Sequence, residues 1–206
     1  MRKNIVSFIL ILTPVVLLPF QVISAKSSPL QISIWGRDLQ LVSSNRTITG
    51  LKLNLGYGEN FRIYGVDFGL GNFIHENVRG GQVGLANGAG KNLIGFQAGL
   101  VNYGGDMTGV PVGLINISNK MTGIRAGFIG NFGMDTVRGL DIGIINIHVR
   151  HLKGVCIGII NFSDELTGLQ IGLFNSARTV KGVQIGLLNV RGPHDRKFMP
   201  IVYASF

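Results

Sequence analysis

The stretch Gly168-Leu-Gln-Ile-Gly-Leu-Phe-Asn175 returns fourteen residues later as Gly182-Val-Gln-Ile-Gly-Leu-Leu-Asn189. We number the first glycine of this phrase as position 0. Clear copies start at Gly65, Gly80, Gly95, Gly109, Gly123, Gly139, Gly154, Gly168 and Gly182. A degenerate copy starts at Gly50, and the spacing between successive starts is nearly constant along the chain. An internal repeat of this regularity decides the fold, so it must be explained first.

Positions 1, 3 and 5 of the repeat are apolar except for Gly81 at position 1, position 4 is glycine in all nine clear copies, and position 2 is mostly polar. A period of two is typical of a β-strand with two unlike faces, and a helix would not keep positions 1, 3 and 5 on one face. We predict that the side chains at position 2 line a lumen or another polar face. The candidates are Lys52, Asp67, Gln82, Gln97, Arg125, Asp141, Gln170 and Gln184.

The alternation continues from position −2 to position 8, which leaves three or four residues for a turn such as Ser163-Asp-Glu165. A parallel neighbour needs a crossover of a dozen or more residues, so this reading predicts an antiparallel meander. The stretches 30–35 and 198–206 read as further strands and bring the total to about twelve. Closing an all-β sheet of this size into a barrel removes its exposed edges. In such pairs each glycine faces a bulky neighbour, and the asparagine at position 7 caps a turn.

Two readings of the barrel and one other fold fit the pattern. In an outer-membrane barrel the face formed by positions 1, 3 and 5 meets lipid, whereas in a soluble surface barrel it faces the core. The terminal Phe206 resembles the C-terminal signal of outer-membrane barrels. The run from Gln170 to Asn175 resembles part of the repeat of curlin amyloid subunits, which implies a β-solenoid as the alternative fold.

The ends and the composition indicate export. Residues 1–25 have the pattern of a signal peptide: Arg2 and Lys3 precede an apolar run, and Ser24-Ala25 offers a cleavage site. Residues 26–206 then form one repeat domain, with repeats over about 48–190. The net charge is +9, but the basic residues are scattered, so we expect no nucleic-acid partner. The single cysteine, Cys156, excludes an intrachain disulfide and is expected to be a small filler.

The order of motifs resembles a known family. The phrases Pro29-Leu-Gln-Ile-Ser-Ile34 and Gly50-Leu-Lys-Leu-Asn-Leu-Gly-Tyr-Gly-Glu-Asn60 are followed by serial units of Gly, apolar, Gln, apolar, Gly, two apolar residues and Asn. This arrangement resembles the leptospiral-type surface-repeat family of exported bacterial proteins over nearly all of residues 29–206. The resemblance implies an outer-membrane or cell-surface protein, with no established enzymatic activity.

Local motifs that suggest chemistry are weak. Gly88-Ala-Gly-Lys-Asn92 is similar to a phosphate-binding loop, but Asn92 replaces the usual Ser or Thr. His148 and His151 lie in one predicted turn, where two histidines could hold a metal. Asp67 and Asp141 share a face and could serve as an acid–base pair. We expect none of these to act, and hence no catalytic, metal or cofactor site. The expected function is a small pore or structural envelope component associated with a membrane, or alternatively a surface binding or adhesion module whose ligand is unknown.

Overall fold

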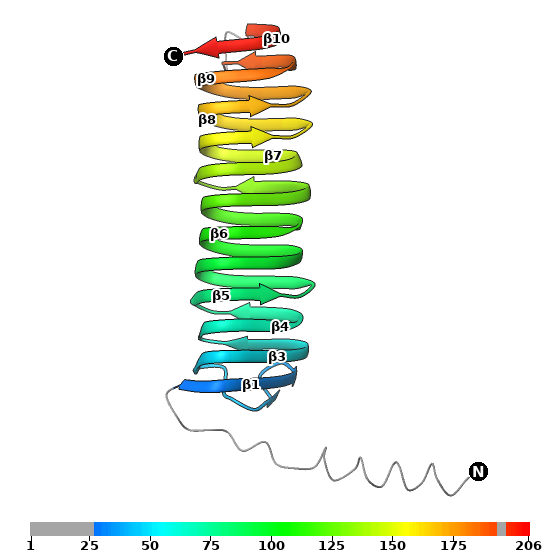
Figure 1. Cartoon of the computed structure of the whole chain (residues 1–206), viewed down its shortest axis with the longest axis vertical. Coiled ribbons are helices and arrows are strands. Elements are labelled where there is room, and N and C mark those ends of the chain that lie inside the picture. Colours follow the sequence, from blue (N-terminus) through cyan, green and yellow to red (C-terminus); the bar gives the residue numbers. More distant parts are fainter. Residues whose placement is uncertain (1–26, 193–196) are drawn as a thin grey trace, which may run out of the picture.

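The structure, a computed structural model, describes residues 27–192 and 197–206, and the predicted signal peptide lies outside them. The chain winds into a straight rod of stacked coils, with β1 at one end and β10 at the other (Figure 1). In chain order the strands are β1 (Ser27–Trp35), β2 (Leu39–Gln40), β3 (Thr47–Asn60), β4 (Arg62–Ile74), β5 (Asn77–Val83), β6 (Ala86–Gly133), β7 (Thr136–Ile157), β8 (Ile160–Ile171), β9 (Phe174–Arg191) and β10 (Lys197–Ser205). The all-β prediction is confirmed.

Successive repeats pair in parallel and in register. Gly65 lies opposite Gly80, and Asp67 lies opposite Gln82. The same register continues to the last coils, where Gly168 lies opposite Gly182. The prediction of an antiparallel meander of about twelve strands closed into a barrel is therefore wrong. The alternative, a β-solenoid, is confirmed, and it has about nine turns.

The antiparallel prediction failed because the stretch from position −2 to position 8 was interpreted as one continuous strand. It contains two strands joined by a bend at positions 4 and 5, as where β5 ends at Val83 and β6 begins at Ala86. One strand runs out and the other returns within a single repeat. One complete repeat is thus itself the crossover that a parallel neighbour requires. The long span of β6 means that several coils follow one another with the strand geometry uninterrupted.

The two ends of the rod differ. At the N-terminal end β1 pairs in parallel with β3, and the short β2 folds back antiparallel beneath β1. At the C-terminal end β10 runs antiparallel along β9, from Lys197 opposite Arg191 to Ser205 opposite Gly182. The strands predicted at 30–35 and 198–206 are therefore present, but they cover the ends of a solenoid and do not close a barrel.

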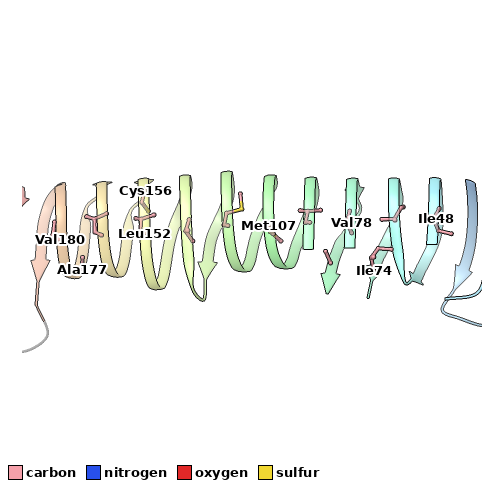
Figure 2. Packing of buried hydrophobic residues seen from close by; sticks show 14 of the residues in the cluster. Ile48, Ile74, Val78, Met107, Leu152, Cys156, Ala177 and Val180 are labelled. Atoms are coloured by element: carbon pink, nitrogen blue, oxygen red, sulfur yellow. The ribbon is translucent and has the colours of Figure 1, made fainter. Parts of the chain in front are cut away.

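The hydrophobic core is one narrow row of side chains inside the rod. It is formed mainly by position −2, two residues before each first glycine, and Figure 2 shows its members following one another along the axis. The row comprises Ile48, Ile63, Val78, Leu93, Met107, Met121, Val137, Leu152, Leu166 and Val180, all at most 2% exposed. Strand alternation places positions −2, 0 and 2 on the same face. The inner face of the first strand is thus the one that carries the polar residues.

The first glycines are required by stacking. From Gly65 to Gly182 they have φ between 127° and 151°, a region that side chains rarely adopt. A Cβ on Gly109 would lie 1.8 Å from the carbonyl oxygen of Gly95, and a Cβ on Gly154 would lie 2.1 Å from that of Gly139. These glycines are therefore not small partners of bulky cross-strand residues, as the antiparallel reading predicted. Each one lies on the glycine of the coil before it.

Coils of different length keep the same register. Gly123 is followed by Asn131, one residue later than in the other clear copies, and the extra residue is taken up by an irregularity between Gly127 and Gly130. The remaining variation in repeat length falls in the turn that follows the second strand. Both glycine and asparagine rows therefore remain continuous.

Candidate functional site

A ladder of asparagines runs through the interior at position 7. The Nδ2 of each one donates to the Oδ1 of the next at 2.8 to 2.9 Å. The other Nδ2 proton is donated to a backbone carbonyl of the next coil, at 2.8 to 3.1 Å. The members are Asn72, Asn87, Asn102, Asn116, Asn131, Asn146, Asn161, Asn175 and Asn189. They do not cap turns, as the sequence suggested; they satisfy one another inside the rod.

The second glycine of each repeat makes room for this ladder. A Cβ on Gly99 would lie 2.6 Å from Nδ2 of Asn87, and one on Gly113 would lie 2.7 Å from Nδ2 of Asn102. A side chain at position 4 would therefore displace the amide of the preceding coil. In the degenerate first copy Asn54 occupies position 4, and its Nδ2 donates to Asn72 at 2.8 Å. Asn54 thus begins the ladder.

All eight residues predicted to line a polar face lie on the inside of the solenoid, and each is at most 1% exposed. The glutamines form short ladders, with Gln97 donating to Gln82 and Gln184 donating to Gln170 at 2.8 Å. The charged members form two separate clusters. This row is packed among backbone and side chains, so no lumen separates it from the rest of the interior in the described chain.

The central cluster joins Arg125, Asp141 and His148. The guanidinium binds both carboxylate oxygens, with Nε to Oδ1 at 3.1 Å, and Nη1 donates to Ser118 Oγ at 3.0 Å. His148 Nε2 lies 2.8 Å from Asp141 Oδ2, and its Nδ1 lies 3.2 Å from the carbonyl oxygen of Phe162. Both ring nitrogens of His148 therefore face acceptor oxygen atoms.

Burial and the hydrogen-bonding partners of Asp141 shift the pKa of its carboxyl group in opposite directions. Removal from water raises the pKa of a carboxyl group, but the hydrogen bond from His148 and the charge of Arg125 outweigh that effect. The pKa of Asp141 is consequently lowered. The carboxylate stays charged inside the rod because Arg125 and His148 both bind it.

In the second charged cluster, near the N-terminal end, burial outweighs the attraction between the two charged groups. Lys52 Nζ lies 3.0 Å from Asp67 Oδ2 and 3.0 Å from the carbonyl oxygen of Gly58. Burial lowers the pKa of Lys52 and raises the pKa of Asp67, and their mutual attraction only partly offsets these shifts. Asn54 also donates to Asp67 at 2.7 Å. The pair is held by hydrogen bonds whether or not the proton moves between its members.

The acid–base pair and the two-histidine site considered from the sequence are not brought together by the fold. Asp67 and Asp141 are five coils apart, or about 24 Å at the usual strand spacing. Each carboxylate pairs with its own basic side chain, Lys52 or Arg125. His148 is buried, whereas His151 pairs with Glu165 on the surface. Within residues 27–192 and 197–206 no group of three or more metal-ligating side chains forms.

The contacts of the glycine-rich stretch 88–92 show that it does not form a phosphate-binding loop. Residues 88–92 lie within β6, where Lys91 pairs with Glu76 of the preceding coil. A Cβ on Gly88 would collide with the ring of Phe73. The segment is therefore part of the stacked sheet and does not form a strand-to-helix turn around a phosphate.

The outer surface carries a continuous apolar strip. We use "apolar strip" for the side chains at positions 3 and 5, with the second glycines between them as its floor. Leu55 is 74% exposed, and Phe128 and Leu187 are each 71% exposed. A groove of about 480 Å³ runs from Val112 to Ile159, and another of about 550 Å³ continues from there over the last coils. Polar rows share the interior with the apolar row at position −2, while the large side chains at positions 3 and 5 face outward.

The edge opposite the bend is charged, and its charges are paired between neighbouring coils. The ion pairs along this edge are Arg62–Glu76, Lys91–Glu76, Lys120–Asp106, Arg150–Asp135, His151–Glu165 and Arg178–Asp164. The rod is therefore amphipathic around its circumference, with the apolar strip on one edge and this paired edge on the other.

Searches against protein-family models, curated proteins and solved structures found no match. The part of the chain that the structure describes contains no helix long and apolar enough to cross a bilayer.

Sequence reasoning found the polar row but missed its environment. It grouped the side chains at position 2 correctly on one strand face, and it separated them from positions 1, 3 and 5. The soluble-barrel interpretation placed the apolar face against an internal core, whereas its side chains at positions 3 and 5 are largely exposed on the described chain. Contact of this face with lipid stays a prediction. The signal that could have revealed this is position −2, which is apolar in every repeat yet shares the face of position 2.

Proposed function

We propose that the chain is an exported, non-enzymatic component of the bacterial outer membrane or cell surface, in which the rod works through its outside. The observation that carries this proposal is the exposed apolar strip. Contiguous apolar surface of this extent on a protein marks a site of association with a membrane or another molecule. The predicted signal peptide and the resemblance to the surface-repeat family support an envelope location.

The distribution of reactive groups supports the absence of catalysis. Asp67, Asp141 and His148 are each at most 1% exposed and already paired. A general acid or base has to reach a substrate within hydrogen-bonding distance. We leave the pore aside and keep the structural role, because packed side-chain rows fill the interior of the solenoid.

A surface binding or adhesion module is the second candidate. It is favoured by the two grooves of about 480 and 550 Å³, which share Ile157 to Ile159 and so form one path along the rod. Apolar clefts of a few hundred cubic ångströms are typical of small-molecule sites. In this role the strip would take an apolar ligand while the rod projects from the cell.

Fractionation of the bacterium tests the envelope role. We expect the protein in the outer-membrane or surface fraction, labelled on intact cells by a membrane-impermeant amine reagent that reaches exposed lysines such as Lys91 and Lys120. A cytoplasmic protein labelled only after lysis is the control. The variant Phe128→Asp with Leu187→Asp should be released into the medium, since both side chains are largely exposed and their change spares the interior. Recovery of unlabelled wild-type protein from the cytoplasm would overturn the proposal.

A further inference from the structure

Apart from Arg37, which pairs with Glu59, the exposed basic residues of the described chain fall into two sets. Those on the edge opposite the bend are paired with carboxylates, as described above. The other set, which we call the basic row, lies at position −1, one residue before the first glycine: Arg79, Arg138, Lys153 and Lys181. All four are exposed, and none forms an ion pair with an acidic residue within the described chain.

The basic row borders the apolar surface. Position −1 projects from the same outer strand face as positions 1 and 3, about 7 and 13 Å away along an extended strand. Long basic side chains can lay their aliphatic stems over apolar surface while the charge reaches a polar medium. Tyr64 occupies the same row, and the Arg79 guanidinium lies 5.6 Å from the centre of its ring. Tyrosine and arginine beside aliphatic residues form a boundary between apolar and polar surroundings.

Two members of the row lie next to each other. Arg138 and Lys153 occupy successive coils in the same position, so their backbones are ~5 Å apart. Like charges directly opposite each other on neighbouring strands are destabilising. No carboxylate of the described chain lies between them, in contrast to Glu76, which bridges Arg62 and Lys91 on the paired edge. The basic row is thus built to face an anion from outside the molecule.

We propose that the apolar strip and the basic row together form a docking surface for a bilayer that contains anionic lipid. This inference rests on the envelope role proposed above and names its partner. The rod lies in the plane of the membrane, with the strip entering the boundary between headgroups and acyl chains to a depth of roughly 5 to 10 Å. The four basic residues bind the headgroup phosphates, and the paired edge faces water.

Charge favours a bilayer over a second copy of the chain. Pairing two rods through their apolar strips would bring two basic rows to one interface, without acidic residues of the described chain between them. Like-charge juxtaposition opposes such an association. An anionic membrane satisfies both the apolar and the basic part of the surface.

Vesicle flotation of the exported, processed protein tests this assignment. The vesicles are phosphatidylcholine with or without phosphatidylglycerol, in ~0.1 M salt, where screening acts over about 10 Å. We expect wild-type protein to float with the anionic vesicles. Replacing the basic row in the variant Arg79→Gln, Arg138→Gln, Lys153→Gln and Lys181→Gln should weaken binding by about fivefold per residue, on the order of a few hundredfold in total.

A matched control removes the same number of positive charges from the paired edge, as Arg62→Gln, Lys91→Gln, Lys120→Gln and Arg178→Gln. This variant should bind anionic vesicles within about threefold of wild type, because those groups face away from the membrane. A third variant, Phe128→Asp with Leu187→Asp, should lose binding to both kinds of vesicle. Circular dichroism must show the same strand content in all variants.

Three results would overturn the inference: equal loss in the two charge variants, binding that ignores lipid charge, or a stable wild-type dimer that does not bind vesicles. These results are separable from failure of the envelope role. Envelope location without vesicle binding would keep the proposed function and reject the lipid partner. A cytoplasmic location would reject the proposed function whatever the vesicles show.

Discussion

The asparagine ladder predicts that replacing Asn116 by aspartate destabilises the fold. Its Nδ2 donates to the carbonyl oxygen of Ala126 at 2.8 Å and to Asn131 Oδ1 at 2.9 Å, and its Oδ1 accepts from Asn102 at 2.8 Å. Asn116→Asp keeps the shape but puts an oxygen where the donor was. The carbonyl oxygen of Ala126 and Oδ1 of Asn131 then both face this new oxygen atom in the interior of the rod.

The size of the effect follows from these contacts. Each buried polar group left without a partner costs about 1 to 3 kcal/mol, and two groups lose their donor. Burying the new carboxylate raises its pKa, which adds to the cost at neutral pH. We expect a loss of about 4 kcal/mol, or a fall in melting temperature of roughly 8 to 16 °C for a chain of this size. Because the folded pKa is raised, the part of the penalty that comes from ionisation is absent below the unfolded pKa of about 4 and grows as the pH rises. In acid the protonated carboxyl group also supplies one of the two lost donors.

Asn119→Asp is the matched control, since Asn119 is exposed in the turn that follows Asn116. A surface change of this kind should stay within about 0.5 kcal/mol. Thermal unfolding followed by circular dichroism at neutral and acidic pH measures both variants. Equal melting temperatures for the two, or a penalty for Asn116→Asp that does not shrink in acid, would refute the ladder as the source of stability.

Three further outcomes are expected. Gly154→Ala places a Cβ 2.1 Å from a carbonyl oxygen and should prevent folding or lower the melting temperature by more than about 10 °C, whereas Gly36→Ala, also at positive φ but with open space around it, should cost only about 1 kcal/mol. Because its folded pKa is lowered, the Asp141 carboxylate stabilises the fold above the unfolded pKa of about 4, and this contribution is lost as the pH falls through the folded pKa. Asp141→Asn should therefore reduce the fall of the urea midpoint below about pH 4, and an unchanged fall would contradict this. Burial raises the pKa of the Cys156 thiol well above its usual value, so a thiol reagent should react with it only after unfolding, and rapid labelling of the native protein would contradict that placement.

Much of the architecture can be read from the repeat. Its period and its alternation predict an all-β fold of strands with two unlike faces. The grouping of Gln82, Gln97 and the other side chains at position 2 on one face agrees with the structure. The bend at positions 4 and 5 could not be recognised, because glycine and leucine there also fit an uninterrupted strand. Missing that bend turned two short strands into one long one, and a parallel solenoid into an antiparallel sheet.

The inside and the outside were harder to predict for a physical reason. A single buried asparagine is costly, so a repeated one suggests a turn. Stacking in register removes that cost, since Asn102 satisfies Asn116 and Asn116 satisfies Asn131. That satisfaction is a property of neighbouring coils and is invisible in one repeat. Once the polar residues can be buried without cost, the aliphatic residues at positions 3 and 5 are left on the surface.

The ladder also gives the rod an electrical direction. Every asparagine donates toward the C-terminal end and accepts from the N-terminal side, so the amide dipoles add along the axis, as peptide dipoles do in a helix. The negative pole lies at Asn54, whose Nδ2 also donates to Asp67, the partner of Lys52. The positive pole lies at Asn189, whose Nδ2 donates to the carbonyl oxygen of Met199 in β10. The two ends of the ladder therefore carry opposite partial charges, whereas the two glutamine pairs, which donate toward the N-terminal end, add dipoles of the opposite sense.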